Sequence, residues 1–416
     1  MKVQLLSTEL IKPSTSTPQS LRDYKISIVD ELCPVMNVPT ILYYPTHIHT
    51  SGKEYGSSIS KCMHLKKSLS KVLTRFYPFA GRYMKDAYLV DCSDQGAEFV
   101  EAKVDIRLDD LIGQGKNLKV ELLNSLLPRP IGAGDQVTDP LLAVQLSVFA
   151  CGGYAIGVLS SHRIADISTT STLIKEWATD ARLLLGGFDE NDNVAVFPIW
   201  NTASMFPGQK MSGLPLGLTR EKENVANPKF VTKKFYFSKS AIAKIREKAR
   251  LDNSSERLPT RVQSLWGIIG KAIVDINVAN PETPRGFLII SGSEHEGKNR
   301  STHSEKSMWK SLLNIHSSIR GRRKRGGTSR PGRSFNALDP EISSVSMFSD
   351  WCKSPFYEAD FGWGKPDWVS SVSVPMRNNV YLLSDKSGEG IEAWVNLNID
   401  DMPKFEQDSN IMELTS

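Results

Sequence analysis

The sequence predicts an α/β protein of two domains, in which mixed sheets are flanked by helices. Its 416 residues exceed the usual size of a single hydrophobic core, and chains of this length generally divide into two domains. Helical and strand patterns recur along the chain on both sides of one long stretch rich in Gly, Pro, Asn and Asp. We therefore expect a first domain over residues 1–185, a crossover linker over 186–228 and a second domain over 229–416.

The first expected domain combines one amphipathic helix with several strands. Residues 58–77 repeat apolar side chains at helical spacing, with Lys and Ser on the other face. Residues 88–104 hold two apolar runs joined by Ser93–Gly96, which is typical of a hairpin. Residues 140–161 carry no charged side chain, but Cys151–Gly153 interrupts them with a turn signal. A hairpin of two buried strands is therefore favoured there over a membrane span.

The helix expected after this hairpin begins among Ser and Thr residues near Ile167, so His162 lies at a strand-to-helix junction. The second expected domain opens with a strand over 230–238 and a helix over 239–250. A further helix begins near Thr260, and strand patterns return over 379–385 and 391–399. One apolar stripe marks that further helix: Val262, Leu265, Ile269, Ile273 and Ile276.

The region 291–340 has a different composition, because it is polar and shows little strand or helix period, so we expect it to be irregular. Within it, Arg320–Arg333 carries seven positive charges and no acid, which exceeds the net charge of +5 of the whole chain. A nucleic-acid-binding protein generally spreads its basic residues over a face. A solvated loop is therefore favoured, and nucleic-acid binding through Arg320–Arg333 is the alternative from another functional class.

The cysteines are odd in number, scattered and never in C-x-x-C spacing, which argues against disulfides and structural zinc and favours a reducing compartment. The first residues lack the apolar core and cleavage site of a signal peptide. The close pair His47 and His49 has no neighbouring Cys or acidic residue, so no metal site is expected. We expect a cytoplasmic protein without membrane contact.

His162 and Asp166 form an H-x-x-x-D pair directly after the apolar hairpin. The hairpin would hold His162 in a partly dry place, and an ordinary pKa near 6.5 leaves the imidazole neutral and able to accept a proton. The sequence contains no G-x-S-x-G, P-loop or G-x-G-x-x-G motif. An H-x-x-x-D pair also recurs by chance, so these residues alone leave a structural histidine open.

Five stretches of the sequence, taken together and in their order along the chain, resemble the plant BAHD acyltransferases and most closely their alkaloid-acetylating branch. The pair of H-x-x-x-D and a later D-F-G-W-G (Asp360–Gly364) is the specific part of the resemblance. The five stretches are residues 10–27, 69–82, 90–102, 151–166 and 351–366.

The resemblance implies a two-domain acyltransferase fold with a channel between the domains. It implies acyl-CoA, and acetyl-CoA above all, as a co-substrate and a hydroxyl of an alkaloid or terpenoid as acceptor, with no permanently bound cofactor. His162 would be the general base, and Asp166 would be a buried structural residue that holds the His162 loop. A structural motif away from the chemistry would comprise Asp360, Gly362, Trp363 and Gly364. The CoA-contacting residues are not identified, and a monomer is expected.

Residues 292–311 depart from the family pattern. The family has an N-L-R triplet, a proline-rich turn and a Gly-Asn pair at this place, and its arginine pairs with the aspartate of the histidine motif. The present chain has a shorter polar stretch. Two hypotheses follow: a working acyltransferase, and a catalytically impaired relative that lacks part of the second domain.

Overall fold

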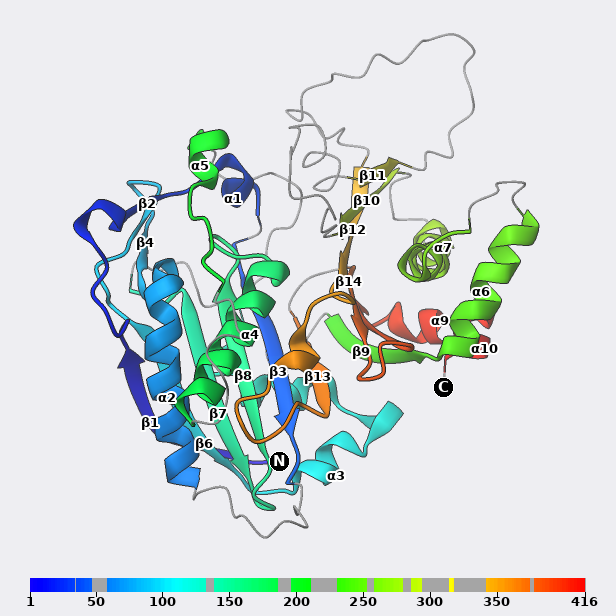
Figure 1. Cartoon of the computed structure of the whole chain (residues 1–416). Coiled ribbons are helices and arrows are strands. Elements are labelled where there is room, and N and C mark those ends of the chain that lie inside the picture. The colour runs from blue at the N-terminus through cyan, green and yellow to red at the C-terminus, as the bar shows by residue number, and fades with distance from the viewer. Residues whose placement is uncertain are drawn as a thin grey trace. The chain divides into compact units, whose positions relative to one another are not determined.

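The structure is a computed structural model in which the chain forms two compact α/β units (Figure 1). The first unit comprises Met1–Leu214 together with Ser354–Val374, and the second comprises Pro215–Lys353 together with Pro375–Ser416. The segment with Asp360–Gly364 thus belongs to the first unit, although it follows most of the second unit in the sequence. The structure describes residues 1–33, 35–46, 58–131, 138–185, 196–210, 230–252, 258–279, 286–293, 314–317, 342–374 and 378–415.

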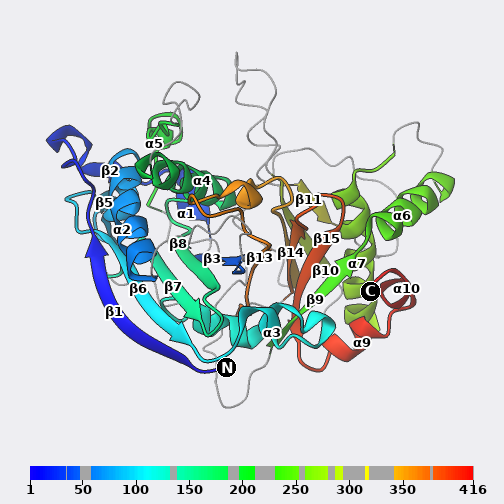
Figure 2. The same cartoon turned by 60° about the horizontal axis from the view of Figure 1, so that its bottom comes forward.

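A six-stranded mixed sheet in the order β1-β6-β7-β8-β3-β13 forms the centre of the first unit (Figure 2). Only β6 and β7 pair in parallel, and all other neighbours are antiparallel. The last strand to join, β13, comes from far along the sequence and pairs with β3. The strands are β1 (Val3–Ile11), β3 (Asn37–Tyr44), β6 (Ala97–Val104), β7 (Leu142–Phe149), β8 (Tyr154–Ser161) and β13 (Trp368–Ser370).

Two long helices, α2 (Ser58–Arg75) and α4 (Ile167–Leu184), lie side by side over this sheet (Figure 1). The helix expected over 58–77 is confirmed, and its apolar stripe is buried from Cys62 to Phe76. The indole N–H of Trp177 donates to the Leu65 carbonyl at 3.1 Å and to Ser68 Oγ at 3.0 Å, which joins the two helices. The shorter helices of this unit are α1 (Ile28–Leu32), α3 (Leu108–Ile112) and α5 (Thr202–Met205), with 3₁₀ turns at Gln19–Leu21, Tyr77–Ala80, Gly115–Asn117, Val120–Leu126 and Phe356–Glu358.

One of the two hairpins expected in this unit is confirmed and the other is wrong. Strands β7 and β8 pair directly, with Gly152 in the turn at φ 82°. The strand before Ser93–Gly96 instead joins a separate three-stranded sheet, whereas the strand after it pairs with β1 and β7. Asp94 at the crossing accepts hydrogen bonds from the N–H and Oγ of Thr17, at 2.9 and 2.7 Å. Distant partners therefore decide the pairing. The small sheet contains β2 (Asp23–Lys25), β5 (Leu89–Asp91) and β4 (Arg82–Met84).

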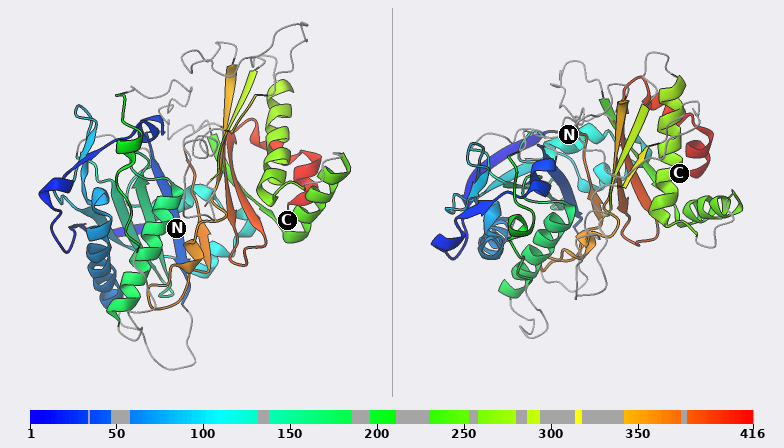
Figure 3. Two further views of the ribbon diagram at one scale, coloured as in Figure 1. Left: turned by 45° about the horizontal axis from the view of Figure 1, so that its top comes forward. Right: turned by 90° about the horizontal axis from the view of Figure 1, so that it is seen from above.

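The second unit is built on another six-stranded sheet, in the order β11-β10-β12-β14-β15-β9. Helices lie along one side of it (Figure 3). The expected strands at the start and end of this unit and its two expected helices are confirmed. Its elements are β9 (Phe230–Phe237), α6 (Lys239–Asp252), α7 (Arg261–Ala279), β10 (Gly286–Ser293), β11 (Asn314–Ser317), β12 (Ile342–Asp350), β14 (Asn379–Ser384), β15 (Ile391–Asn398), α9 (Met402–Glu406) and α10 (Ser409–Leu414).

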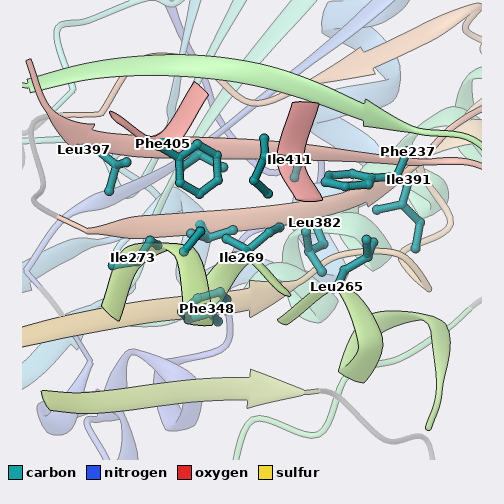
Figure 4. Packing of buried hydrophobic residues seen from close by; sticks show 14 of the residues in the cluster. Phe237, Leu265, Ile269, Ile273, Phe348, Leu382, Ile391, Leu397, Phe405 and Ile411 are labelled. Atoms are coloured by element: carbon teal, nitrogen blue, oxygen red, sulfur yellow. The ribbon is translucent and has the colours of Figure 1, made fainter. Parts of the chain in front are cut away.

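The core of the second unit lies between this sheet and its helices (Figure 4). Leu265, Ile269 and Ile273 of the expected apolar stripe are buried there, and Val262 and Ile276 pack at its edge. Alternate residues of β14 and β15 meet them from the sheet, which is the period of two that a strand with one buried face requires.

The region 291–340, expected to be irregular, contributes two pieces to the second sheet. Residues 291–293 end β10, and Asn314–Ser317 forms β11, which pairs antiparallel with β10. The remaining residues of this region, with Arg320–Arg333, lie outside the described residues. His47 and His49 also lie outside them. Within the described ranges, no helix is long and apolar enough to cross a membrane.

Candidate active site

His162 lies in the short connection between β8 and α4, as expected. Its backbone N–H donates to the carbonyl of Met36 at 2.9 Å. Asn37, which follows Met36, opens β3 and pairs with Ser161 at the end of β8. The segment before β3 therefore fixes the position of the His162 backbone.

The His162 ring is held in a dry environment. Its Nδ1 is buried and makes no hydrogen bond within the described part of the chain. Burial lowers the pKa of His162, and this effect outweighs the charge of Asp166 and the carbonyls of His162 and Ala165, which favour the protonated ring. The residue as a whole is only partly buried. The imidazole is therefore neutral at neutral pH and able to accept a proton.

Asp166 caps α4. One of its carboxylate oxygens accepts the N–H of Thr169 at 2.8 Å, a position where a negative charge also favours the helix dipole. The residue is exposed, whereas a buried carboxylate was expected, because a cap lies at the open end of its helix. The negative charge of Asp166 acts on Asp30 of α1. Burial is the main cause that raises the pKa of Asp30, and the charge of Asp166 raises this pKa further. Among the described residues, Asp166 makes no ion pair.

Asp360 organises the turn that carries the D-F-G-W-G motif. One oxygen of its carboxylate accepts the N–H groups of Gly362 and Gly364, at 2.8 and 3.0 Å. Both glycines have positive φ, of 104° and 107°, which side chains disfavour. The other carboxylate oxygen lies 4.0 Å from Nε of Arg182, near the end of α4. The motif thus folds on its own carboxylate and lies against α4.

Aromatic packing attaches this motif to the first unit. Phe361 is fully buried and contacts the ring of Trp177 edge to face, with ring centroids 4.9 Å apart. Trp363 meets the rings of His64 and Tyr154 in the same manner. The Tyr44 hydroxyl donates to the Ala359 carbonyl at 2.8 Å, just before the motif.

The motif and His162 lie at opposite ends of β8. Tyr154, which contacts Trp363, is the first residue of this strand, and His162 follows its last residue. A rise of about 3.3 Å per residue places about 25 Å between them. Helix α4 spans the same distance in the opposite direction, since Asp166 caps its start near His162 and Arg182 near its end lies close to the motif. The structure therefore does not bring Asp360, Gly362, Trp363 and Gly364 to His162.

Lys61, which lies near the motif, was not predicted from the sequence. Its ammonium lies 5.4 Å from the ring centre of Tyr154 and 5.7 Å from that of Trp363. Burial lowers its pKa. The three residues are far apart in the sequence, so no local pattern could have identified this contact. Among the described residues, no group of His, Cys, Asp and Glu side chains could hold a metal ion.

A sequence model of a transferase family matches residues 1–293 and 335–412. Limonoid 1-O-acetyltransferase of Citrus sinensis is 34% identical over 450 residues, covering 100% of this chain and 99% of its own. Vinorine synthase of Rauvolfia serpentina is 31% identical over 424 residues, covering 96% of this chain and 95% of its own.

The solved structure of vinorine synthase matches with a TM-score of 0.76 and 28% identity over 100% of this chain and 99% of that one. TRI101 of F. sporotrichioides, in complex with coenzyme A and T-2, matches with a TM-score of 0.64 and 18% identity over 95% and 99% of the two chains, which supports the fold alone. These similarities confirm the expected mixed α/β fold of an acyltransferase.

The family match leaves out residues 294–334. This gap falls inside the region that the sequence distinguishes by its composition. The family model therefore supports the pattern on both sides of the gap and leaves the residues within it unmatched.

Proposed function

Because the chain belongs to the plant BAHD acyltransferases, we propose that this acyltransferase moves an acetyl group from acetyl-CoA to a hydroxyl of a plant specialised metabolite, an alkaloid or a terpenoid. The names of its relatives support this choice, since they include acetyltransferases for limonoids, stemmadenine and salutaridinol. Acyl-CoA is the co-substrate that the family chemistry requires.

His162 is the general base of the proposed reaction. Since Nδ1 is buried, we assign Nε2 as the atom that takes the proton from the acceptor hydroxyl. The oxygen then attacks the thioester carbonyl, the C–S bond breaks, and the CoA thiolate receives the proton from the imidazolium. The observation that carries this assignment is the position of His162 at the end of β8, in a residue that is only partly buried and whose pKa burial lowers, which keeps the base neutral when substrate binds.

Asp166 and the D-F-G-W-G motif have supporting roles in this proposal. Asp166 holds the start of α4 and adds a negative charge that stabilises the imidazolium formed during the reaction. Asp360, Gly362, Trp363 and Gly364 stabilise the fold at the other end of β8.

A catalytically impaired relative is the second candidate, and the gap in the family match over residues 294–334 favours it. The test is an assay of purified protein with acetyl-CoA and a panel of hydroxylated alkaloids and limonoids, with products detected by mass spectrometry. Calorimetric titration with coenzyme A separates the candidates: binding without turnover means that the acceptor is still missing from the panel. A folded protein that neither binds coenzyme A nor turns over any acceptor is an impaired relative.

We also propose a cytoplasmic monomer with an acyltransferase domain over residues 1–185, a crossover linker over 186–228 and a second domain over 229–416, of which Ser354–Val374 belongs to the first compact unit. All five cysteines are free thiols, and Cys62 and Cys92 are buried, which suits a reducing compartment. Light scattering coupled to size-exclusion chromatography tests the oligomeric state.

A further inference from the structure

The crossover linker is bound to the first unit at three places between residues 196 and 210. The Val196 N–H donates to Oε2 of Glu176 at 3.0 Å. The Trp200 indole N–H donates to the Arg75 carbonyl at 3.1 Å, and its ring meets the edges or faces of four aromatic rings. The third place is a carboxylate on α1.

The carboxylate of Glu31 accepts two consecutive backbone N–H groups of the linker. Gln209 donates to Oε2 at 3.1 Å and Lys210 donates to Oε1 at 3.0 Å. Glu31 is 7% exposed, although the linker residues above it are exposed. A buried carboxylate held by two peptide N–H groups is a strong, charge-assisted contact.

Gly208 allows this contact. A Cβ at this position would lie 2.6 Å from Oε1 of Glu31 and 2.6 Å from the carbonyl of Ile26, so the backbone of the linker would have to move. Nearby, the Ile28 N–H donates to the Phe206 carbonyl at 3.1 Å, and Ser27 forms an isolated bridge with Pro207. The linker is therefore bound along the start of α1.

Helix α1 is in turn connected to His162. The chain leaves α1 and reaches Met36, whose carbonyl binds the His162 N–H. The negative charge of Asp166, at the end of the connection that carries His162, is also among the causes that raise the pKa of Asp30 on the same helix, after burial. A displacement of α1 would therefore reach the base through one hydrogen bond.

We infer that Glu31 is a positioning residue for the base: by binding Gln209 and Lys210, it holds α1 against the linker and thereby sets the position of His162. This inference rests on the proposed function only for its effect on turnover. Its structural part, the dependence of residues 161–166 on Glu31, stands independently of any activity.

The test uses Glu31→Gln and Gly208→Ala in the full chain. Glu31→Gln keeps the shape of the side chain and places an NH₂ group against a peptide N–H, whereas Gly208→Ala displaces the linker and leaves the charge in place. The matched control is Asp94→Asn, which weakens a similar contact between a carboxylate and the Thr17 N–H in the same unit. Two different variants keep the test valid if one of them fails to fold.

Hydrogen–deuterium exchange followed by mass spectrometry is the first measurement. We expect both variants to exchange faster than the wild type over 206–210 and over 161–166, whereas Asp94→Asn leaves 161–166 unchanged. Faster exchange confined to 206–210 in both variants would overturn the inference. The exchange rates can be measured even if the wild type turns over no acceptor. A lack of turnover would count against the proposed function and not against the positioning role of Glu31.

Kinetics provide the second measurement in an active protein. Because small displacements of a catalytic group are costly, we expect kcat to fall about 10- to 100-fold in both variants, with the KM for acetyl-CoA within about twofold. Hydration of a loosened ring would raise the His162 pKa, so the acid limb of the pH profile should move to higher pH. Unchanged kcat and an unmoved acid limb would contradict the role, since loss of stability alone moves neither in folded protein.

Discussion

The two ends of β8 differ in construction. At the start of the strand, Phe361 is fully buried and rings surround the D-F-G-W-G motif. At the other end, His162 keeps a buried Nδ1 without a partner among the described residues, beside an exposed Asp166. Both ends hold buried polar atoms without a partner among the described residues, namely Nδ1 of His162 at one end and Nε1 of Trp363 and the Tyr154 hydroxyl at the other, so the contrast lies in aromatic packing and exposure. In the proposed mechanism, the length of β8 separates the base from the D-F-G-W-G motif.

The largest effect should follow from His162→Ala. Removal of the base should lower kcat by about 10²- to 10⁴-fold, with little change in Tm. The matched control is His64→Ala at the opposite end, where the ring binds the Ala181 carbonyl at 2.7 Å and meets Trp363. That control should lose about 1–2 kcal/mol of unfolding free energy and keep its kcat. A folded His162→Ala enzyme with full activity would refute the base assignment.

Phe361→Ala should produce the largest loss of stability. Truncating this buried ring leaves a cavity, which typically costs about 3–5 kcal/mol. Urea unfolding followed by fluorescence measures the loss, and kcat is then determined at a temperature where the variant is folded. An undiminished kcat per folded molecule is expected. A fall in kcat as large as that of His162→Ala would show that the two ends are not separate.

Gly362→Ala and Gly364→Ala should each cost about 1–3 kcal/mol, because both positions have positive φ. A Cβ on residue 362 would also overlap with Cδ1 of Leu185, whereas one on residue 364 meets nothing within 4 Å. Leu185 is 47% exposed and can rotate away, so we expect the two losses to differ by less than about 1 kcal/mol. Chemical denaturation of both variants checks this. A much larger loss for Gly362→Ala would mean that Leu185 is fixed in place.

Asp166→Asn should have the smallest effect on stability. Asn is also a good helix cap, so the change should be a few tenths of a kcal/mol, whereas Asp166→Ala should lose about 1 kcal/mol. Both variants remove a negative charge that raises the His162 pKa. The acid limb of the pH profile should therefore move to lower pH in both. Movement to higher pH would show that Asp166 does not act on the imidazole through its charge.

The local periodicity of apolar residues was sufficient to predict much of the fold. The stripes of α2 and α7 and the β7–β8 hairpin depend on contacts between neighbours in sequence, so their patterns are visible in the chain itself. The pairing of β5 and β6 is set by β2, β4, β1 and β7, and a turn pattern at Ser93–Gly96 carries no information on those partners.

The position of His162 at a strand-to-helix junction was predictable, because an apolar run and a run of Ser and Thr adjoin it. The cap at Asp166 was missed, since Ser and Thr residues inside the helix resemble the same signal. Glu31 gave no signal at all: it binds two backbone N–H groups in a linker almost 180 positions away. Peptide groups are the same in every residue, so such a contact leaves no trace in side-chain patterns.

The pairing of β13 with β3 also affects how the protein folds while it is being synthesised on the ribosome. The first unit lacks its final strand until Trp368–Ser370 has been synthesised, in a chain of 416 residues. Folding of one domain after another during translation is therefore incomplete for this unit, and the edge of β3 stays open to foreign strands while the second unit is made. Chain termination before residue 368 should leave an N-terminal fragment prone to aggregation, and slow, cool expression should favour soluble protein.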